Sequence, residues 1–171
     1  MTPATARISL AAAAGVGFAT TDAGTGFTAS AEGRTAVALG PIRRAVLAVG
    51  FDRASSTVRG GPASGSTLDV VTLPIRLGVG GRVGWAELRL GGLARPYFTR
   101  GLGERDGIVW GAWAALAVEA PRRGPVAAFG ILGVDLHPQP ITFSYAGQAI
   151  LGVRVFAPWV GVGVAWRGSA A

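Results

Sequence analysis

Asp135 and His137 are the two residues of this sequence that come closest to a catalytic arrangement. They lie two positions apart, so on an extended strand both side chains point to the same face. A carboxylate beside an imidazole can orient the ring as a general base, and Ser144 in the following segment could then act as a nucleophile. The spacing is a weak signal, however, and His137 directly precedes Pro138 at the expected start of a loop. We favour the alternative, a solvated loop histidine, and expect no catalysis from this segment.

Charged residues offer a second kind of chemistry. The 171 residues carry 16 basic and 9 acidic side chains, a net charge of +7, and every basic residue is arginine. We favour a GC-rich coding bias as the reason for this excess. The alternative is anionic partners, because arginine pairs well with phosphate and carboxylate. No dense basic run occurs, so we expect no nucleic-acid partner. The absence of cysteine and the single histidine predict neither a metal site nor a cofactor.

The elements that must position these side chains are β-strands. Apolar residues alternate with polar or small ones at a period of two, as where Ile8 and Leu10 flank Ser9. A signal peptide is the alternative for residues 6–19, but the strict alternation favours a strand, which would make the sequence a mature form or part of a longer protein. The predicted strands cover residues 6–18, 27–39, 43–53, 68–79, 85–96, 108–119, 125–137 and 158–167.

Composition favours a membrane-spanning barrel over a soluble domain. Half of the residues are hydrophobic and 15% are charged, against about 25% in an ordinary soluble domain. No segment reaches the ~20 apolar residues of a membrane helix, and apart from helices only closed barrels can span lipid. A soluble β-barrel or sandwich that binds an apolar ligand is the alternative. Its second face would be more polar than the glycine, alanine and few charges present here.

The links between segments alternate in length. Short links at 40–42, 80–84 and 121–124 alternate with long ones at 54–67, 97–107 and 138–157, and only the 19–26 link departs from this contrast. This predicts one all-β domain over residues 1–171, an antiparallel up-and-down barrel of eight strands with short periplasmic turns and longer extracellular loops. We expect a hairpin inside 138–157, formed by 141–145 and 149–153. Pro74 requires a bulge, and the last strand begins near Pro158 or bulges there.

The two faces of the predicted strands differ in charge. One face lacks charged residues in mid-strand and is assigned to lipid, with aromatic residues near the strand ends where girdles form. The other face points into a lumen that is just wide enough for side chains, so its charges must pair, and a structural plug is favoured over an ion pathway. The expected lipid-facing aromatic residues are Phe18, Phe27, Phe51, Trp110 and Trp166. The expected lumen charges are Arg7, Glu32, Arg34, Arg44, Asp52, Arg76, Glu87, Arg89, Arg95, Glu119 and Asp135.

The 97–107 link carries a charged tip made of Arg100, Glu104, Arg105 and Asp106. Its arginines could contact the phosphates of lipopolysaccharide, because guanidinium groups form strong charge-assisted hydrogen bonds with them. A solvated loop without a partner is the alternative.

The closing segment 159–166, with valines and glycines between Trp159 and Trp166, is similar to the C-terminal strand of small outer-membrane β-barrel proteins of Gram-negative bacteria. The resemblance covers nearly the whole chain, although residues 167–171 follow the final aromatic. It implies an outer-membrane location, contact with membrane lipid, recognition by the barrel-assembly machinery and a monomer. The expected role is structural, surface-interacting or membrane-anchoring. The alternative is a barrel enzyme that acts on lipid or peptide at the loop rim through Asp135, His137 and Ser144.

Overall fold

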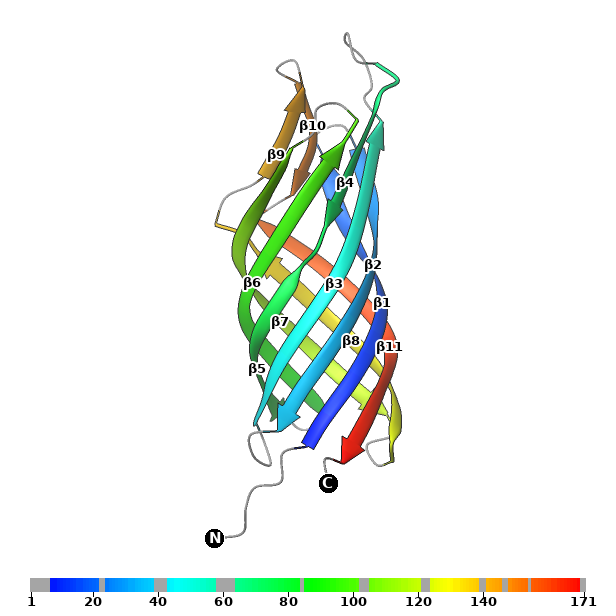
Figure 1. Ribbon diagram of the computed structural model, residues 1–171, viewed down its shortest axis with the longest axis vertical. Coiled ribbons are helices and arrows are strands. Elements are labelled where there is room, and N and C mark those ends of the chain that lie inside the picture. The colour runs from blue at the N-terminus through cyan, green and yellow to red at the C-terminus, as the bar shows by residue number, and fades with distance from the viewer. Residues whose placement is uncertain are drawn as a thin grey trace.

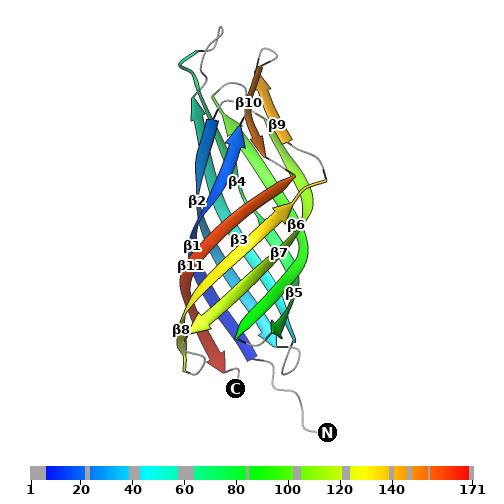
Figure 2. The ribbon, with the colours of Figure 1, turned by 180° about the vertical axis from the view of Figure 1, so that it is seen from behind.

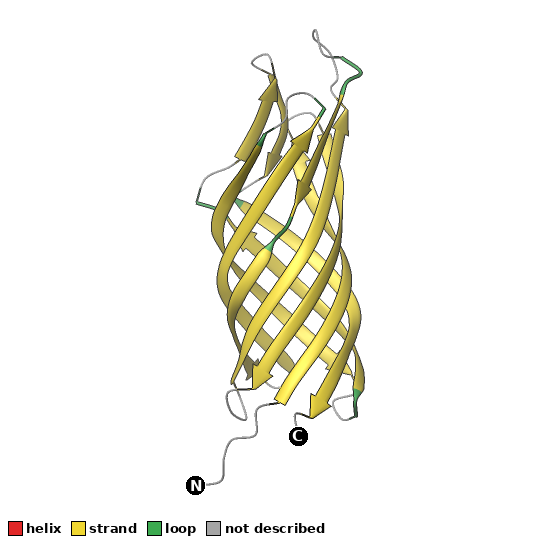
Figure 3. Cartoon of the chain, in the orientation of Figure 1, coloured by secondary structure: helices red, strands yellow, loops and turns green. Residues whose placement is uncertain are grey.

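The computed structural model of the chain describes residues 7–21, 24–38, 43–57, 64–83, 85–101, 105–120, 124–138, 141–145, 148–153 and 155–169. Almost all of this part is β-strand, as the cartoon in Figure 3 shows. No helix long and apolar enough to cross a membrane occurs in it. The strands are β1 (Arg7–Thr21), β2 (Gly24–Ala38), β3 (Arg43–Thr57), β4 (Thr67–Thr72), β5 (Ile75–Val83), β6 (Ala86–Arg100), β7 (Asp106–Ala120), β8 (Val126–Leu136), β9 (Ile141–Tyr145), β10 (Gln148–Val153) and β11 (Phe156–Ser169).

The strands close into an eight-stranded antiparallel barrel. Each pairs with its neighbour in sequence, β4 and β5 together occupy one place between β3 and β6, and β11 closes the circle by pairing with both β8 and β1. Figures 1 and 2 show the tilted strands from opposite sides. Closure leaves no lipid-facing sheet edge along the paired length, which is the condition for a β-structure to span a bilayer. The predicted fold class is therefore confirmed.

The barrel has two different ends. At one end, called the turn end here, β1 begins, β11 ends and β2, β5 and β7 are followed by short links (Figure 1). At the other, called the loop end, β9 and β10 form a separate two-stranded sheet within the longest link (Figure 2). These two strands cover nearly the residues expected for the hairpin, with β10 beginning one residue earlier.

Several strands reach further toward the loop end than the sequence predicts. β1 continues to Thr21 and β2 already begins at Gly24, so the link between them is shorter than the predicted 19–26. β3 continues to Thr57, and β6 continues to Arg100. The prediction from sequence missed these extensions because the alternation of apolar and polar residues weakens where polar residues replace the apolar ones.

Pro74 interrupts its strand without adding a residue. The register of β3 against β4 and against β5 is the same on both sides of the break, and so is the register against β6. The expected bulge is therefore wrong. The ladder survives because Pro74 supplies its carbonyl oxygen to the Gly50 N–H at 2.8 Å, and Leu73 donates its N–H to the Pro96 oxygen at 2.9 Å. The ladder lacks the reciprocal bonds at these two places, because neither Pro74 nor Pro96 has an N–H to donate.

Pro158 also lies within an unbroken register. β11 begins two residues earlier, at Phe156, and pairs with β8 without a shift as far as Trp166. The expectation of a strand start near Pro158 therefore holds, and its alternative, a bulge at this proline, is wrong. The His137 N–H also donates to the Val155 oxygen at 2.8 Å, so the pairing closes directly beneath the segment that carries β9 and β10.

The exterior and the lumen have opposite chemistry. Among the described side chains, the outer face is apolar from the turn end to a point near the loop end, and charged residues occur on it only there, near the loop end. A soluble barrel with an apolar ligand would need the reverse arrangement. The large exposed residues of this apolar band include Leu47, Val49, Leu77, Val79, Leu90, Leu132, Val162 and Val164.

Candidate functional site

The most deeply buried polar group in the described lumen is the Asp135 carboxylate, whose side chain has 0% exposure. It lies near the loop end of β8, and two arginines from β5 and β6 reach it. Arg76 donates Nε–H to Oδ1 at 3.1 Å and Nη2–H to Oδ2 at 2.7 Å, a bidentate geometry that fixes both groups. Arg95 also donates an Nη2–H to Oδ2.

Three further groups complete this arrangement, which we call the loop-side cluster: Asp52, Arg76, Arg95, Asp135, His137 and Trp159. The indole Nε1–H of Trp159 donates to Asp135 Oδ1 at 3.1 Å, while its ring lies 4.6 Å from the Arg76 guanidinium carbon. This stacking is a favourable cation–π geometry. Asp52 lies 4.0 Å from Arg95 and accepts a hydrogen bond from Thr72 at 3.3 Å.

Gly133 makes room for Trp159. A Cβ atom on Gly133 would overlap the six-membered ring of the indole, so only glycine allows the indole to lie flat against β8 beside Asp135. The pairing of Trp159 with Gly133 across β11 and β8 sets this contact.

His137 is buried in the lumen beside Arg95. It is only 2% exposed, so the expected solvated loop histidine is wrong. Its Nε2 lies 3.3 Å from Nη1 of Arg95, and because a guanidinium can only donate, this contact requires Nε2 to be the unprotonated ring nitrogen. The lone pair that a general base needs is therefore directed at a cation. Asp135 is engaged by the two arginines and Trp159, and exposed Ser144 lies on β9.

A second group of charges lies at the turn end, and we call it the turn-side cluster: Arg44, Glu87, Arg89 and Glu119. Arg44 approaches Glu87 at 3.3 Å and Glu119 at 3.9 Å. Arg89 approaches the same two carboxylates at 2.9 Å and 3.7 Å. This cluster is wetter than the other, because the Arg44 side chain is 29% exposed and that of Glu119 19%. Exposed Arg82 and Trp85 line a small pocket beside it.

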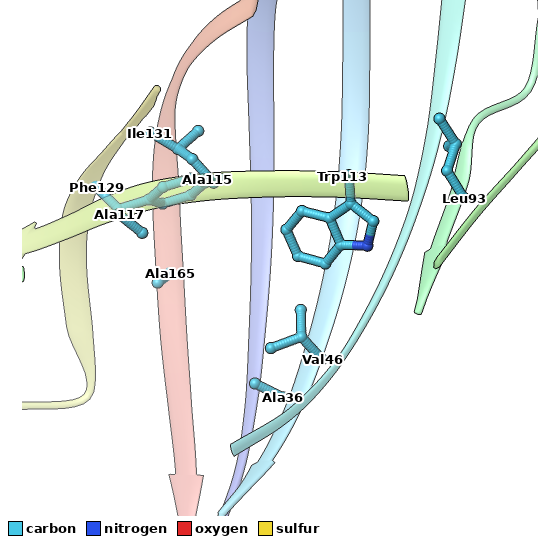
Figure 4. Packing of buried hydrophobic residues seen from close by; sticks show 9 residues of the cluster. All are labelled: Ala36, Val46, Leu93, Trp113, Ala115, Ala117, Phe129, Ile131 and Ala165. Atoms are coloured by element: carbon cyan, nitrogen blue, oxygen red, sulfur yellow. The ribbon is translucent and has the colours of Figure 1, made fainter. Parts of the chain in front are cut away.

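An apolar layer separates the two clusters. On β6 the inward residues run from Arg89 through Gly91 and Leu93 to Arg95, so one strand passes from one cluster through the layer to the other. On β3 Val46 and Ala48 separate Arg44 from Asp52 in the same way. Figure 4 shows the residues of this layer, which are Ala36, Val46, Leu93, Trp113, Ala115, Ala117, Phe129, Ile131 and Ala165.

Each cluster contains two arginines and two carboxylates, so each is neutral by itself. Neutrality within each layer matters because charges placed in a low-dielectric interior must find their partners locally. Among the described side chains, this apolar layer lies between the two clusters. Within the described residues, no group of three or more histidine, aspartate or glutamate side chains is arranged to hold a metal ion.

The structure places most of the sequence-predicted site residues. Of the expected lumen charges, the eight from Arg44 onward lie in these two clusters, whereas the side chains of Arg7, Glu32 and Arg34 lie outside the described part, as does Glu104 of the charged tip. Phe51, Trp110 and Trp166 lie on the outer face. The other two expected aromatic residues, Phe18 and Phe27, are backbone register partners in the β1–β2 pairing, and their side chains lie outside the described part.

Sequence reasoning missed several aromatic residues, among them Trp113 and Phe129 of the apolar layer. Phe98 is exposed on the outer face near the loop end, whereas Trp85 is exposed at the turn end and lines the pocket beside the turn-side cluster. Trp159 was noticed only as part of the last strand, although its parity already placed it on the same face as the other lumen residues. Its partner Asp135 could not be identified, because the two lie on different strands and their register is set by the whole barrel.

A closed eight-stranded barrel with an apolar exterior and a packed, charged lumen is the architecture of small outer-membrane proteins. The chain has this fold, as three solved structures confirm. They are a major outer membrane protein from Thermus thermophilus (TM-score 0.62, 16% identity, 96% of this chain and 100% of that chain covered), Neisserial surface protein A (0.58, 12%, 93% and 96%), and Ail, the attachment invasion locus protein of Yersinia pestis (0.55, 8%, 95% and 97%). No protein-family model and no curated protein matches the sequence.

Proposed function

We propose that this chain is a single-domain outer-membrane β-barrel with a lumen filled by its own side chains. Its role is structural, surface-interacting or membrane-anchoring, and it catalyses no reaction. The observation that carries the proposal is the inversion of the two faces: the outer band is apolar and uncharged, while the lumen holds two neutral charge clusters. The turn end then faces the periplasm and the loop end faces the outside of the cell.

The three similar structures support this location and this type of role. Two of them are named as a surface protein and an outer membrane protein, and the third, Ail, was solved with the heparin analogue sucrose octasulfate. For this chain we infer membrane lipid as the constant partner, the barrel-assembly machinery as a partner during insertion, and a monomeric state. Arg100 and Arg105 near the loop end make anionic surface ligands, lipopolysaccharide among them, the favoured class of further partner.

The contacts of His137 argue against the alternative of a rim enzyme. Its Nε2 faces Arg95, and Asp135 is engaged by two arginines, so neither group is available for proton transfer. We therefore expect His137→Ala to change no lipid- or peptide-hydrolysing activity of the folded barrel. A hydrolytic activity that is present in the parent protein and lost in this variant would favour the enzyme.

The proposal is tested by the behaviour of the purified chain in detergent. A folded membrane barrel migrates faster than its heat-denatured form on a cold detergent gel, because the closed strands resist unfolding until heated. We expect this shift and expect insertion into lipid vesicles. A chain that is folded and monodisperse in plain buffer without detergent would overturn the membrane location.

A further inference from the structure

The outer face changes from apolar to charged within a few residues near the loop end, on three adjacent strands. Phe51 on β3 is exposed on the outer face, and two residues further along β3 comes Arg53, whose side chain is 60% exposed. On β6 the outward residue Phe98 is followed, two residues later, by exposed Arg100. Since side chains two apart on a strand share a face, each arginine extends beyond an exposed phenylalanine.

Asp69 on β4 lies between the two arginines. It pairs directly with Arg100 in the β4–β6 register, and its Oδ2 lies 3.1 Å from Nη2 of Arg53. A hydrogen bond from Ser55 lowers the pKa of Asp69 below its ordinary value, and the ion pair with Arg53 acts in the same direction. These contacts hold the Asp69 carboxylate in place in its ionised form. The group of Arg53, Asp69 and Arg100 therefore has a net charge of +1. Neighbouring Arg105 and Asp106 add one charge of each sign.

This position is where a bilayer presents its headgroups. Aromatic side chains mark the interface, and the charges directly beyond them meet the polar part of the lipid. The two arginine backbones are separated by one intervening strand and by two residues along it, about 12 Å, so both long side chains can reach one group between them. Guanidinium groups bind phosphate oxygens in a planar, bidentate way that neutral headgroups cannot match.

Resting on the outer-membrane location proposed above, we propose that Arg53 and Arg100, with Asp69 between them, form a binding site on the outer wall for the phosphorylated headgroup of an outer-leaflet lipid. The phosphate binds the outward faces of both guanidinium groups, and the lipid chains lie along Phe51 and Phe98. Asp69 holds Arg53 in place when the lipid is absent and opposes the phosphate when it is present.

The test compares the binding of diphosphorylated, monophosphorylated and dephosphorylated lipid A to the folded barrel in detergent by native mass spectrometry. We expect affinity to fall as phosphates are removed. Each of Arg53→Gln and Arg100→Gln should lower the affinity for the diphosphorylated form about fivefold, and the double variant about 25-fold. Asp69→Asn, which removes the opposing carboxylate, should tighten binding. Arg82→Gln is the matched control, because Arg82 is an exposed arginine at the turn end.

Equal affinity for the three lipids, or full retention of affinity in the double variant, would overturn the site. A loss in Arg82→Gln as large as that in the double variant would also overturn it, since it would indicate general charge attraction. Competition by inorganic phosphate alone, at concentrations equal to those of the lipid, would contradict the lipid as the occupant. The heat-induced gel shift of the same samples separates failure of the site from failure of the membrane location, because every variant must first show a folded barrel.

Discussion

The two charge clusters of the lumen have the same composition but differ in their access to water. Each contains two arginines and two carboxylates, yet Asp135 is fully enclosed, whereas Arg44 and Glu119 remain partly exposed. The enclosed carboxylate accepts hydrogen bonds from Arg76, Arg95 and Trp159, while Glu119 meets its arginines at 3.7 and 3.9 Å. The difference indicates that both clusters need charge neutrality. Water can replace a missing partner in the turn-side cluster, but it cannot do so in the loop-side cluster.

The largest effect is expected from Asp135→Asn, which keeps the shape of the side chain and removes its charge. Two buried arginines then lose their main anion, and breaking a buried ion pair in this way costs about 3–5 kcal/mol. Urea unfolding of the barrel in lipid vesicles, followed by the folded band on a cold detergent gel, measures the change. A loss below about 1 kcal/mol would contradict the difference between the clusters.

A smaller loss is expected from Trp159→Phe. The ring that covers Arg76 is kept, but the Nε1–H that donates to Asp135 is removed, and a hydrogen bond to a charged group contributes about 1.5–3 kcal/mol. The same unfolding measurement applies. The double variant with Asp135→Asn should lose less than the sum of the two single changes, and strict additivity would indicate that the indole acts by packing alone.

In the turn-side cluster, Glu119→Gln is the counterpart of Asp135→Asn. Its long contacts and partial exposure place it among ion pairs that contribute about 0–1 kcal/mol, because water solvates the arginines that remain. The unfolding midpoint should therefore move little. A loss equal to that of Asp135→Asn would show that exposure is not what distinguishes the two clusters.

The smallest effect is expected for the ion pair outside the lumen, Arg53 with Asp69. Because the folded-state pKa of Asp69 is lowered, its contribution is fully present above the ordinary aspartate pKa and is lost as the pH falls through the lower, folded-state value. Asp69→Asn should thus match the parent in strongly acidic solution and differ slightly from it at neutral pH. A difference that grows on acidification would reverse the sign and refute the lowered pKa.

Much of the fold was predictable because alternation along one strand depends only on local sequence. The uncharged outer face, the short links at one end and the hairpin in the last long link all follow from residues close together in the chain. The break at Pro74 was misjudged as a bulge, because whether a residue is inserted depends on the registers with two neighbouring strands. Sequence alone reports the proline but not those registers.

The site was predictable as a list of inward charges and not as pairs. Parity places Arg76, Arg95 and Asp135 in the lumen, but their contacts join β5, β6 and β8 and depend on the tilt and closure of the barrel. The same limit explains His137. A histidine before a proline at a strand end suggests a loop, whereas closure of β8 against β11 buries it beside Arg95.

The central claim is that the chain's own side chains close the lumen, with an apolar layer between two neutral charge clusters. Planar-bilayer recording of the folded barrel tests it most directly, because an ion would have to cross both clusters and the apolar layer. We predict no steady conductance at either polarity. A stable open channel in the unmodified protein would contradict the filled lumen.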